Sequence, residues 1–247
     1  MQLEVTLTPT LYAHRTLKQH QTTVAVDVLR ATTAICAALQ AGADMVVPLD
    51  SLEPLPRYRD MGFTLAAERG GVKVDLVASG GKIMAAEFGN SPTEYMRHDL
   101  HGHKLAYSTT NGTVSLARAA DAERTLVGSF ANISALTQCL ASDGRDVVIL
   151  CSGWEGAPCL EDTLFAGALA ERLVTTAGAT LVNDSATMAL ALWHAANGDP
   201  LAICQNATHV ARLRRLGAEA DIEFAFRTDT CPLVPQLTDG AITLIQP

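Results

Sequence analysis

The feature that most constrains the fold is a pattern that occurs three times along the chain. A short apolar run leads into a turn rich in Thr, Ser, Asn or Gly, and an alanine- and leucine-rich helical pattern follows. The apolar runs cover residues 23–26, 104–107 and 146–151. Short apolar runs that alternate with helices are typical of a doubly wound sheet. We therefore expect an α/β fold with three layers, α/β/α, around a mostly parallel or mixed sheet.

Further apolar runs predict additional strands of this sheet. They cover residues 3–7, 45–47, 126–128, 180–182, 222–226 and 242–245. The sequence Ser91-Pro92-Thr93-Glu94 predicts a capping box in front of a helix near Tyr95–Asp99, because Ser favours the N-cap, Pro the first helical position and Glu the third.

The length of the chain, 247 residues, fits one large domain or two closely packed halves. We expect residues 1–247 to form a single unit. The alternative is two subdomains with a break near residues 142–145, where Ser-Asp-Gly-Arg interrupts the pattern of strands and helices.

Composition and charge exclude several classes of protein. Hydrophobic residues make up 48% of the chain and charged residues 18%, which argues against a disordered chain and against a coiled coil. The net charge is -8 and no run of Lys or Arg occurs, so we expect no binding to nucleic acid or to an anionic membrane. No apolar stretch reaches the about 18 residues that a membrane span needs.

Cysteine usage and the start of the chain predict a cytoplasmic protein. The six cysteines form no CxxC pair, which favours free thiols over disulfides or a zinc site. Residues 1–4 lack the basic start of a signal peptide. Whether the chain forms a homo-oligomer is left open by the sequence.

One polar turn, residues 108–113, has the composition of an oxyanion site. In an open α/β sheet a ligand lies beyond the carboxyl ends of the strands, where N–H groups at helix N-termini attract anions. This turn supplies hydroxyl groups, an amide and a glycine that lets the backbone approach a ligand. The residues with these groups are Thr109, Thr110, Asn111, Gly112 and Thr113. The alternative is that they only cap a helix.

A second polar turn follows the apolar run at residues 23–26. Asp27 offers a carboxylate and Arg30 a guanidinium that can hold an oxyanion with two hydrogen bonds. Thr32 and Thr33 add hydroxyl groups. A capping Asp beside a surface Arg is the alternative.

A third turn, residues 152–156, leads to the adjacent carboxylates Glu161 and Asp162. Such a pair at the start of a helix commonly complements the helix dipole, but it also suits Mg²⁺, which takes one or two carboxylates together with water and phosphate oxygens. Asp229 and Asp184 are weaker candidates for the same role. The histidines at positions 98, 101 and 103 fit a solvated loop better than a metal site.

Standard phosphate and nucleophile motifs are absent from the sequence. There is no GxxxxGK[ST], no GxSxG and no GxGxxG after a strand. Asp27 has no second Asp two residues later, and Ala157 stands where a cysteine phosphatase with nucleophile Cys151 would have an arginine. The three polar turns therefore predict an oxyanion and metal site without a standard fingerprint.

At these turns the sequence resembles the 2-phosphosulfolactate phosphatase family. The matching segments are residues 26–33, 88–95, 108–113, 151–156 and 160–162, and a spaced tail from Leu216 to Pro235. Glu68-Arg69-Gly70 also resembles a Glu-Arg-Gly segment of the family. The resemblance begins near residue 22 and continues in the same order to the C-terminus. The first and third of these segments together make it specific.

The resemblance implies a Mg²⁺-dependent phosphatase that converts 2-phospho-3-sulfolactate, a small anionic phosphate ester, into 3-sulfolactate and phosphate. In methanogens that step belongs to coenzyme M biosynthesis. The alternatives are a phosphatase of another 2-hydroxy-acid phosphate and a protein that binds oxyanions on the same scaffold without catalysis.

We expect Asp27, Arg30, Glu161 and Asp162 to be catalytic, with Mg²⁺ held by the carboxylates among them or by Asp229. The nucleophile is either water or Asp27. The expected substrate-binding residues come from the polar turns and from the matching segments: Thr32, Thr33, Arg69, Asn90, Ser91, Thr109, Thr110, Asn111, Gly112, Thr113, Ser152 and Gly153.

Overall fold

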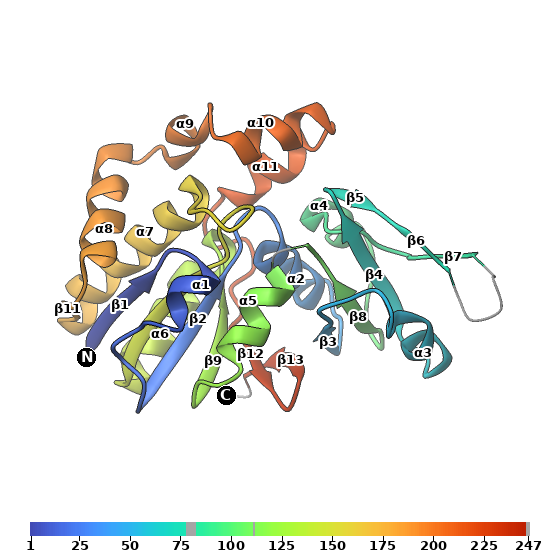
Figure 1. Cartoon of the computed structure of the whole chain (residues 1–247), viewed down its shortest axis with the longest axis horizontal. Helices are drawn as coiled ribbons and strands as arrows, with labels where there is room; N and C mark the ends of the chain where they lie inside the picture. Colours follow the sequence, from blue (N-terminus) through green and yellow to red (C-terminus); the bar gives the residue numbers. More distant parts are fainter. Residues whose placement is uncertain (78–82, 111, 246–247) are drawn as a thin grey trace.

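The computed structural model describes residues 1–77, 83–110 and 112–245. Within these residues eleven strands form one mixed sheet, in the order β11-β1-β10-β2-β9-β12-β13-β3-β8-β4-β5 (Figure 1). The bounds of its strands are β1 Gln2–Thr6, β2 Gln21–Val26, β3 Met45–Pro48, β4 Thr64–Arg69, β5 Val72–Lys73, β8 Lys104–Ser108, β9 Arg124–Gly128, β10 Asp146–Cys151, β11 Thr180–Leu181, β12 Pro235–Thr238 and β13 Ala241–Leu244. A separate hairpin consists of β6 Asp75–Val77 and β7 Ile83–Ala85.

The helices follow most of these strands along the chain. Their bounds are α1 Pro9–Tyr12, α2 Ala31–Gln40, α3 Leu55–Asp60, α4 Pro92–Tyr95, α5 Gly112–Ala119, α6 Ile133–Asp143, α7 Leu160–Ala177, α8 Asp184–Ala196, α9 Pro200–Cys204, α10 Thr208–Arg215 and α11 Glu219–Ala225, with a short 3-10 helix at Phe130–Asn132.

The large sheet consists of two parallel halves joined by a C-terminal hairpin. Strands β11, β1, β10, β2 and β9 are parallel to one another, and so are β3, β8 and β4. The hairpin β12–β13 lies between the halves and pairs antiparallel with both. Three antiparallel pairings in succession mean that the strands of the second half run opposite to those of the first.

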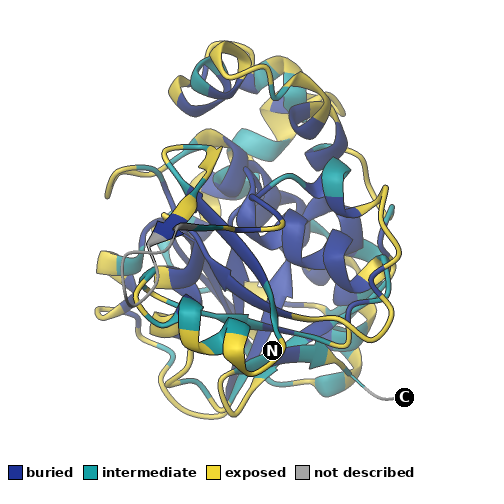
Figure 2. Ribbon diagram, turned by 90° about the vertical axis from the view of Figure 1, so that its right-hand side faces the viewer, coloured by how far each residue is buried: buried dark blue, intermediate teal, exposed yellow. Residues whose placement is uncertain are grey.

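Helices cover both faces of the first half. On β2, Val24 and Val26 pack into a core with α6, α7 and α8, whereas Ala25 points to the other face and packs with α1, α2 and α5. This alternation follows from the strand period of two. Figure 2 shows buried strands between helices whose outer faces are exposed. The expected three-layer α/β fold is confirmed.

A C-terminal arm, which we define as α9 to α11, crosses the top of the view in Figure 1 from α8 towards α4. Its last helix is fixed to α4 by side-chain hydrogen bonds, because the Asp221 carboxylate accepts from the hydroxyl groups of Ser91 and Thr93. The arm therefore brings residues far along the chain against the loops that follow β2 and β10.

The prediction of a strand at residues 222–226 is wrong, because this segment is the end of helix α11 and its C-cap, Phe226. Its sequence, Ile-Glu-Phe-Ala-Phe, is mostly apolar, as a buried strand would be, but the buried residues Asp221, Ile222, Phe224 and Ala225 follow helical spacing. Strands β4, β5, β6, β7 and β12 were not among the expected strands. The N-cap at Ser91 is confirmed, since its Oγ accepts the N–H of Glu94 at 3.2 Å, although the helix ends at Tyr95.

The segment at residues 142–145 is the end of α6 and the turn into β10. Helix α6 ends at Gly144, which adopts the left-handed conformation that suits a glycine C-cap. The strands on either side of this turn, β9 and β10, belong to the same half of the sheet. Division of the chain into subdomains at this point stays a prediction.

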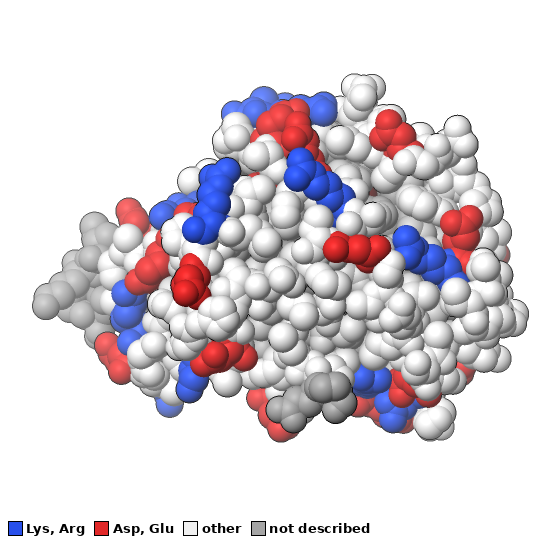
Figure 3. Space-filling model, turned by 180° about the vertical axis from the view of Figure 1, so that it is seen from behind, with Lys and Arg blue, Asp and Glu red and all other residues white. Residues whose placement is uncertain are grey.

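The remaining expectations concern thiols, membranes and surface charge. All six cysteines are free. Within the described part of the chain no helix combines the length and apolar character of a membrane span. On the face shown in Figure 3, acidic and basic side chains are interspersed among uncharged ones.

The closest approach of helices α7 and α8 gives a test of the fold. A Cβ added to Gly167 would lie 2.1 Å from the carbonyl oxygen of Ala189. We expect Gly167→Ala to lower the free energy of unfolding by about 1–3 kcal/mol, because the helices must separate to admit the methyl group. Urea denaturation measures this. Thr175→Ala, on the exposed side of α7, is the control and should change stability by less than about 0.5 kcal/mol. Equal stability of Gly167→Ala and wild type would contradict this packing.

Candidate active site

The loop after β2 places Asp27 at the N-terminus of α2. The Asp27 N–H donates to Thr32 Oγ1 at 2.9 Å, and the same hydroxyl donates to the Asp27 carbonyl at 2.8 Å. Thr33 Oγ1 donates to the carbonyl of Val28 at 2.9 Å. Both threonine hydroxyls therefore bond within the loop and fix its backbone.

The N-terminus of α5 approaches the carboxylate of Asp27 from the second half of the sheet. A Cβ built on Gly112 would lie 2.2 Å from the Cβ of Ala31 and 2.9 Å from Asp27 Oδ2, so only glycine allows this approach. Asp27 Oδ1 accepts the N–H of Ala31 at 3.2 Å. Two helix N-termini thus favour negative charge around Asp27.

The carboxylate of Asp162, at the start of α7, joins two loops. Its Oδ1 accepts the N–H of Val28 at 2.8 Å, and its Oδ2 accepts the N–H groups of Ser152 and Gly153, each at 3.1 Å. The side chain is buried, with 2% of its surface exposed. Asp162 therefore holds the loops after β2 and β10 in a fixed relation.

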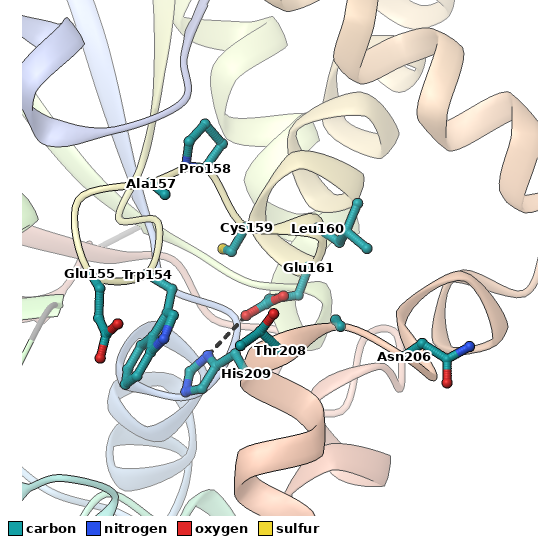
Figure 4. Close-up of a pocket in the computed structure, with 11 residues that line it drawn as sticks. Trp154, Glu155, Ala157, Pro158, Cys159, Leu160, Glu161, Asn206, Thr208 and His209 are labelled. Carbon is teal, nitrogen blue, oxygen red and sulfur yellow. Dashed lines mark hydrogen bonds and ion pairs between the residues drawn. The ribbon is translucent and has the colours of Figure 1, made fainter.

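The adjacent Glu161 pairs with His209 of the C-terminal arm. Glu161 Oε1 lies 2.9 Å from His209 Nδ1, and the other oxygen, Oε2, is buried with no hydrogen-bond partner among the described residues. The His209 ring stacks on Trp154 with the ring centres 4.3 Å apart. These three residues line one side of a cavity of about 440 Å³ between the loop after β10 and the arm (Figure 4).

Arg30 is fixed by two partners. Its Nη1 lies 2.8 Å from Asp221 Oδ2 on α11, and its Nη2 donates to the carbonyl of Gly71 at 2.8 Å. Arg30 and Asp221 are both buried. The guanidinium is therefore clamped between the C-terminal arm and the turn that connects β4 and β5.

The loops after β4 and β8 form the opposite wall of the site. The Glu68 carboxylate accepts the N–H of Gly71 and, at 3.3 Å, the hydroxyl of Thr110. Thr109 Oγ1 is buried and has no partner among the described residues. Asn90 accepts a hydrogen bond from the Tyr107 hydroxyl. Unpartnered buried hydroxyls are rare, so Thr109 Oγ1 is open to a bond with a ligand.

These walls enclose a small central cavity. It is lined by Asp27, Leu29, Arg30, Glu68, Gly71, Asn90, Thr109, Thr110, Trp154, His209 and Leu213. Residues from both halves of the sheet and from the C-terminal arm therefore surround one space. Trp154 and His209 also line the larger cavity of Figure 4, so the two cavities share a wall.

The carboxylates of the site repel one another. Burial raises the pKa of Asp27 to about 6, and the charges of Glu161 and Glu68 add to this, while His209 and the Ala31 N–H oppose it. Burial also raises the pKa of Asp162, as do the charges of Asp27 and Glu161. A cation or a proton among these groups would relieve the repulsion.

The donor set fits a cation that keeps part of its water shell. Among the described residues no three Asp, Glu, His or Cys side chains come close enough to form an all-protein metal cage. Mg²⁺ commonly binds through one or two carboxylates, with water and substrate phosphate completing its shell. Asp27, which the charge of Glu161 affects, and Glu161, whose Oε2 has no partner among the described residues, are the carboxylates that could hold such an ion.

Comparison with known proteins shows the family of this chain. A family model described as 2-phosphosulpholactate phosphatase matches residues 6–240. A protein of Synechococcus sp. (strain CC9605), named probable 2-phosphosulfolactate phosphatase, is 38% identical over 224 residues, which are 89% of this chain and 90% of that one. The chain belongs to this family. Proteins of the same name from Symbiobacterium thermophilum and Thermotoga petrophila are 34% and 33% identical, covering 90% and 91% of this chain and 94% and 92% of their own.

Most of the residues that the sequence predicted to be catalytic or substrate-binding lie at the central cavity or in the loops that support it. Asp27, Arg30, Asn90, Thr109 and Thr110 line the cavity. Several others support it instead. Ser91 bonds to Asp221, Arg69 donates to Ser108 Oγ, Thr113 donates to the Thr109 carbonyl, and Ser152 and Gly153 donate to Asp162.

Two of the expected residues are not part of this group. Both carboxylate oxygens of Asp229 accept hydrogen bonds from Ser134 at the start of α6, through its N–H and its hydroxyl. Asp229 thus caps a helix in the structure. Asn111 lies outside the described residues.

Four residues of the site were not among those expected: Glu68, Trp154, His209 and Asp221. His209 has no metal-like spacing to another histidine, and only the folding of the C-terminal arm brings it to Glu161. Asp221 directly precedes residues 222–226, which were expected to form a strand, and it lies in the C-terminal tail that matches the family. Glu68 and Trp154 belong to segments that match the family, and that match was the available signal for them.

Asp162 and Glu161 provide a matched pair for a stability test. We expect Asp162→Asn to lower the free energy of unfolding by about 2–4 kcal/mol, because an amide NH₂ cannot accept the N–H groups that now bond to a carboxylate oxygen. Glu161→Gln should cost less than about 1 kcal/mol, since Oε2 has no bond to lose. Urea denaturation of both variants decides this, and equal losses would mean that Asp162 does not organise the loops.

The raised pKa of Asp27 predicts a pH-dependent cost to stability. The pKa of this carboxyl group is about 6 in the folded chain and 3.8 in the unfolded chain. The free energy of unfolding therefore falls as the pH rises from about 4 to above 6. Asp27→Asn removes this cost and should stabilise the protein at pH 8 by roughly 1–3 kcal/mol. The gain should shrink below pH 6 and vanish near pH 4. Urea denaturation in EDTA at several pH values measures it, and a destabilised variant at pH 8 would refute it.

Proposed function

We propose that this chain hydrolyses 2-phospho-3-sulfolactate to 3-sulfolactate and phosphate, and that Mg²⁺ is required. The names of its relatives support the substrate. The observation that carries the proposal is the single cavity at which Asp27, Arg30, Thr109 and Thr110 meet. A carboxylate, a guanidinium and hydroxyl groups in one place suit a phosphate monoester.

The phosphoryl group would lie against Arg30 and the loop after β8. An arginine has five N–H donors, and two of those of Arg30 are used by Asp221 and Gly71. The remaining donors are held in a fixed direction and can bind phosphoryl oxygens. Thr109 Oγ1 and the neighbouring backbone add further donors. Fixed donors stabilise charge that develops in the transition state without reorganisation.

Asp27 and Glu161 would hold the Mg²⁺ ion. When bound, the ion would supply positive charge to the phosphoryl oxygens and to the attacking oxygen. Asp162 has its oxygens occupied by three N–H groups, so its contribution is to fix the position of the two loops.

In the hydrolysis, a water oxygen forms a bond to phosphorus and the bond to the hydroxy-acid oxygen breaks. A carboxylate at the cavity, Asp27 or Glu68, takes the proton of the water. The departing alkoxide gains a proton, which His209 is placed to supply because it lines the cavity. Direct attack by the Asp27 carboxylate on phosphorus is the competing route, with water releasing phosphate in a second step.

Phosphate release tests the activity directly. We expect the wild-type protein to release phosphate from 2-phospho-3-sulfolactate with Mg²⁺, to stop in EDTA, and to recover when Mg²⁺ is restored. A panel of other phosphorylated 2-hydroxy acids identifies a different substrate. Binding of 2-phospho-3-sulfolactate without phosphate release would instead favour a non-catalytic oxyanion-binding protein.

Arg30 should be needed for the reaction rather than for general binding. We expect Arg30→Lys to lower kcat/KM by about 10-fold or more and Arg30→Ala by about 10²–10³-fold, because a flexible ammonium does not reproduce a fixed guanidinium. Arg97→Ala, at an exposed arginine beyond α4, is the control and should behave as wild type. Unfolding temperatures separate lost catalysis from lost structure, since Asp221 loses its partner in both Arg30 variants. Unchanged kcat/KM in a folded Arg30→Lys variant would remove Arg30 from the site.

A further inference from the structure

A second guanidinium, that of Arg212, packs against two residues that line the central cavity. The Cζ atom of Arg212, on α10, lies 4.7 Å from the centre of the Trp154 ring. A Cβ added to Gly71 would lie 3.3 and 3.4 Å from the two terminal nitrogens of Arg212. Trp154 and Gly71 both line the cavity that contains Asp27. The Arg212 guanidinium is therefore held between two of its walls.

Arg212 differs from the other arginines in its surroundings. Most arginines in the described ranges have a carboxylate, carbonyl or hydroxyl partner, as Arg30 has in Asp221. Five arginines have no hydrogen bond or ion pair to the described residues. Arg212 is half-buried, whereas the other four are exposed: Arg57, Arg97, Arg118 and Arg215. A positioned guanidinium without a carboxylate partner keeps its full charge and its donors for a ligand.

Gly71 separates the two guanidinium groups of the site. Its carbonyl oxygen accepts from Arg30, while its Cα borders Arg212. A side chain at this position would also meet Leu216 at 2.6 Å, so glycine permits the close approach of α10 to the turn. An anion bound by Arg30 and a second anion bound by Arg212 would therefore lie on opposite sides of Gly71.

We propose that Arg212 binds the sulfonate of the substrate and thereby sets substrate specificity. This inference rests on the proposed function, because it assigns a second anionic group to a substrate whose phosphate lies at Arg30. The charge of Arg30 is balanced by Asp221, so an added sulfonate requires another cation. A planar guanidinium matches two sulfonate oxygens in the way that it matches those of a carboxylate or phosphate.

The test compares two substrates that differ in the sulfonate. 2-Phospho-3-sulfolactate carries it, and 2-phospholactate retains the phosphate and carboxylate without it. We expect Arg212→Ala to raise KM for 2-phospho-3-sulfolactate by about 10–100-fold, the equivalent of a lost charged hydrogen bond, with little change in kcat. Kinetics with 2-phospholactate should be unchanged, so the preference between the substrates should fall by the same factor.

Further variants distinguish charge from packing against Trp154. Arg212→Lys keeps the charge and should recover part of the lost affinity, whereas Arg212→Met keeps the length of the side chain and should behave as Arg212→Ala. Arg215→Ala, at an exposed arginine of the same helix, is the control and should match wild type. Recovery by Met but not by Lys, or equal losses with both substrates, would overturn the proposal.

Failure of the proposed function would be visible separately. If wild-type protein releases no phosphate from 2-phospho-3-sulfolactate, the proposed function is wrong, and calorimetry with 3-sulfolactate and lactate then tests Arg212 alone. Tighter binding of 3-sulfolactate by wild type, weakened about 10–100-fold in Arg212→Ala, would support the sulfonate site. Equal binding of 3-sulfolactate by the two proteins, or none by either, would overturn it.

Discussion

The site depends on one buried carboxylate, that of Asp162, which accepts three backbone N–H groups from two loops. Loop backbone near a sheet edge leaves N–H groups without strand partners, and each buried, unsatisfied donor costs about 1–3 kcal/mol. By satisfying three of them at once, Asp162 fixes the loop of Asp27 relative to the loop of Trp154. These two loops carry Asp27, Arg30 and Trp154 of the cavity lining. Asp162, which the sequence suggested as a metal ligand, therefore has a structural function: it holds two loops of the site together.

The topology explains why the site needs segments from so much of the chain. The two parallel halves of the sheet run in opposite directions and are joined through the β12–β13 hairpin, with a single residue pair, Ile242 and Val46, linking β13 to β3. Contacts beyond the sheet must therefore hold the halves together at the cavity. Gly112 on α5 against Asp27, and Arg30 against Gly71, are contacts of this kind. The C-terminal arm adds Asp221 and His209, so the cavity is complete only when the last helices have docked.

The sequence was sufficient for the parts of this arrangement that depend on local pattern. Alternation of apolar runs and helices predicted the layers, and the polar residues after β2, β8 and β10 predicted loops whose residues line the two neighbouring cavities. The arm was not predictable in the same way, because the pairing of His209 with Glu161 and of Asp221 with Arg30 joins residues 48 and 191 positions apart. Residues 222–226 show where prediction from the pattern of apolar residues fails, since so short an apolar run fits a strand as well as one turn of a helix.

The balance of charge in the site connects its stability with its chemistry. Burial raises the pKa of Asp27, and the nearby charges of Glu161 and Glu68 raise it further, so keeping these carboxylates together costs stability in the folded chain. Arg30 lines the same cavity, and its charge is paired with that of Asp221. A divalent cation among the carboxylates would offset the repulsion and create an attractive place for a phosphate. Substrate and cation would then each favour the binding of the other. The same carboxylates that destabilise the folded chain would attract the cation, and its binding would stabilise the folded chain.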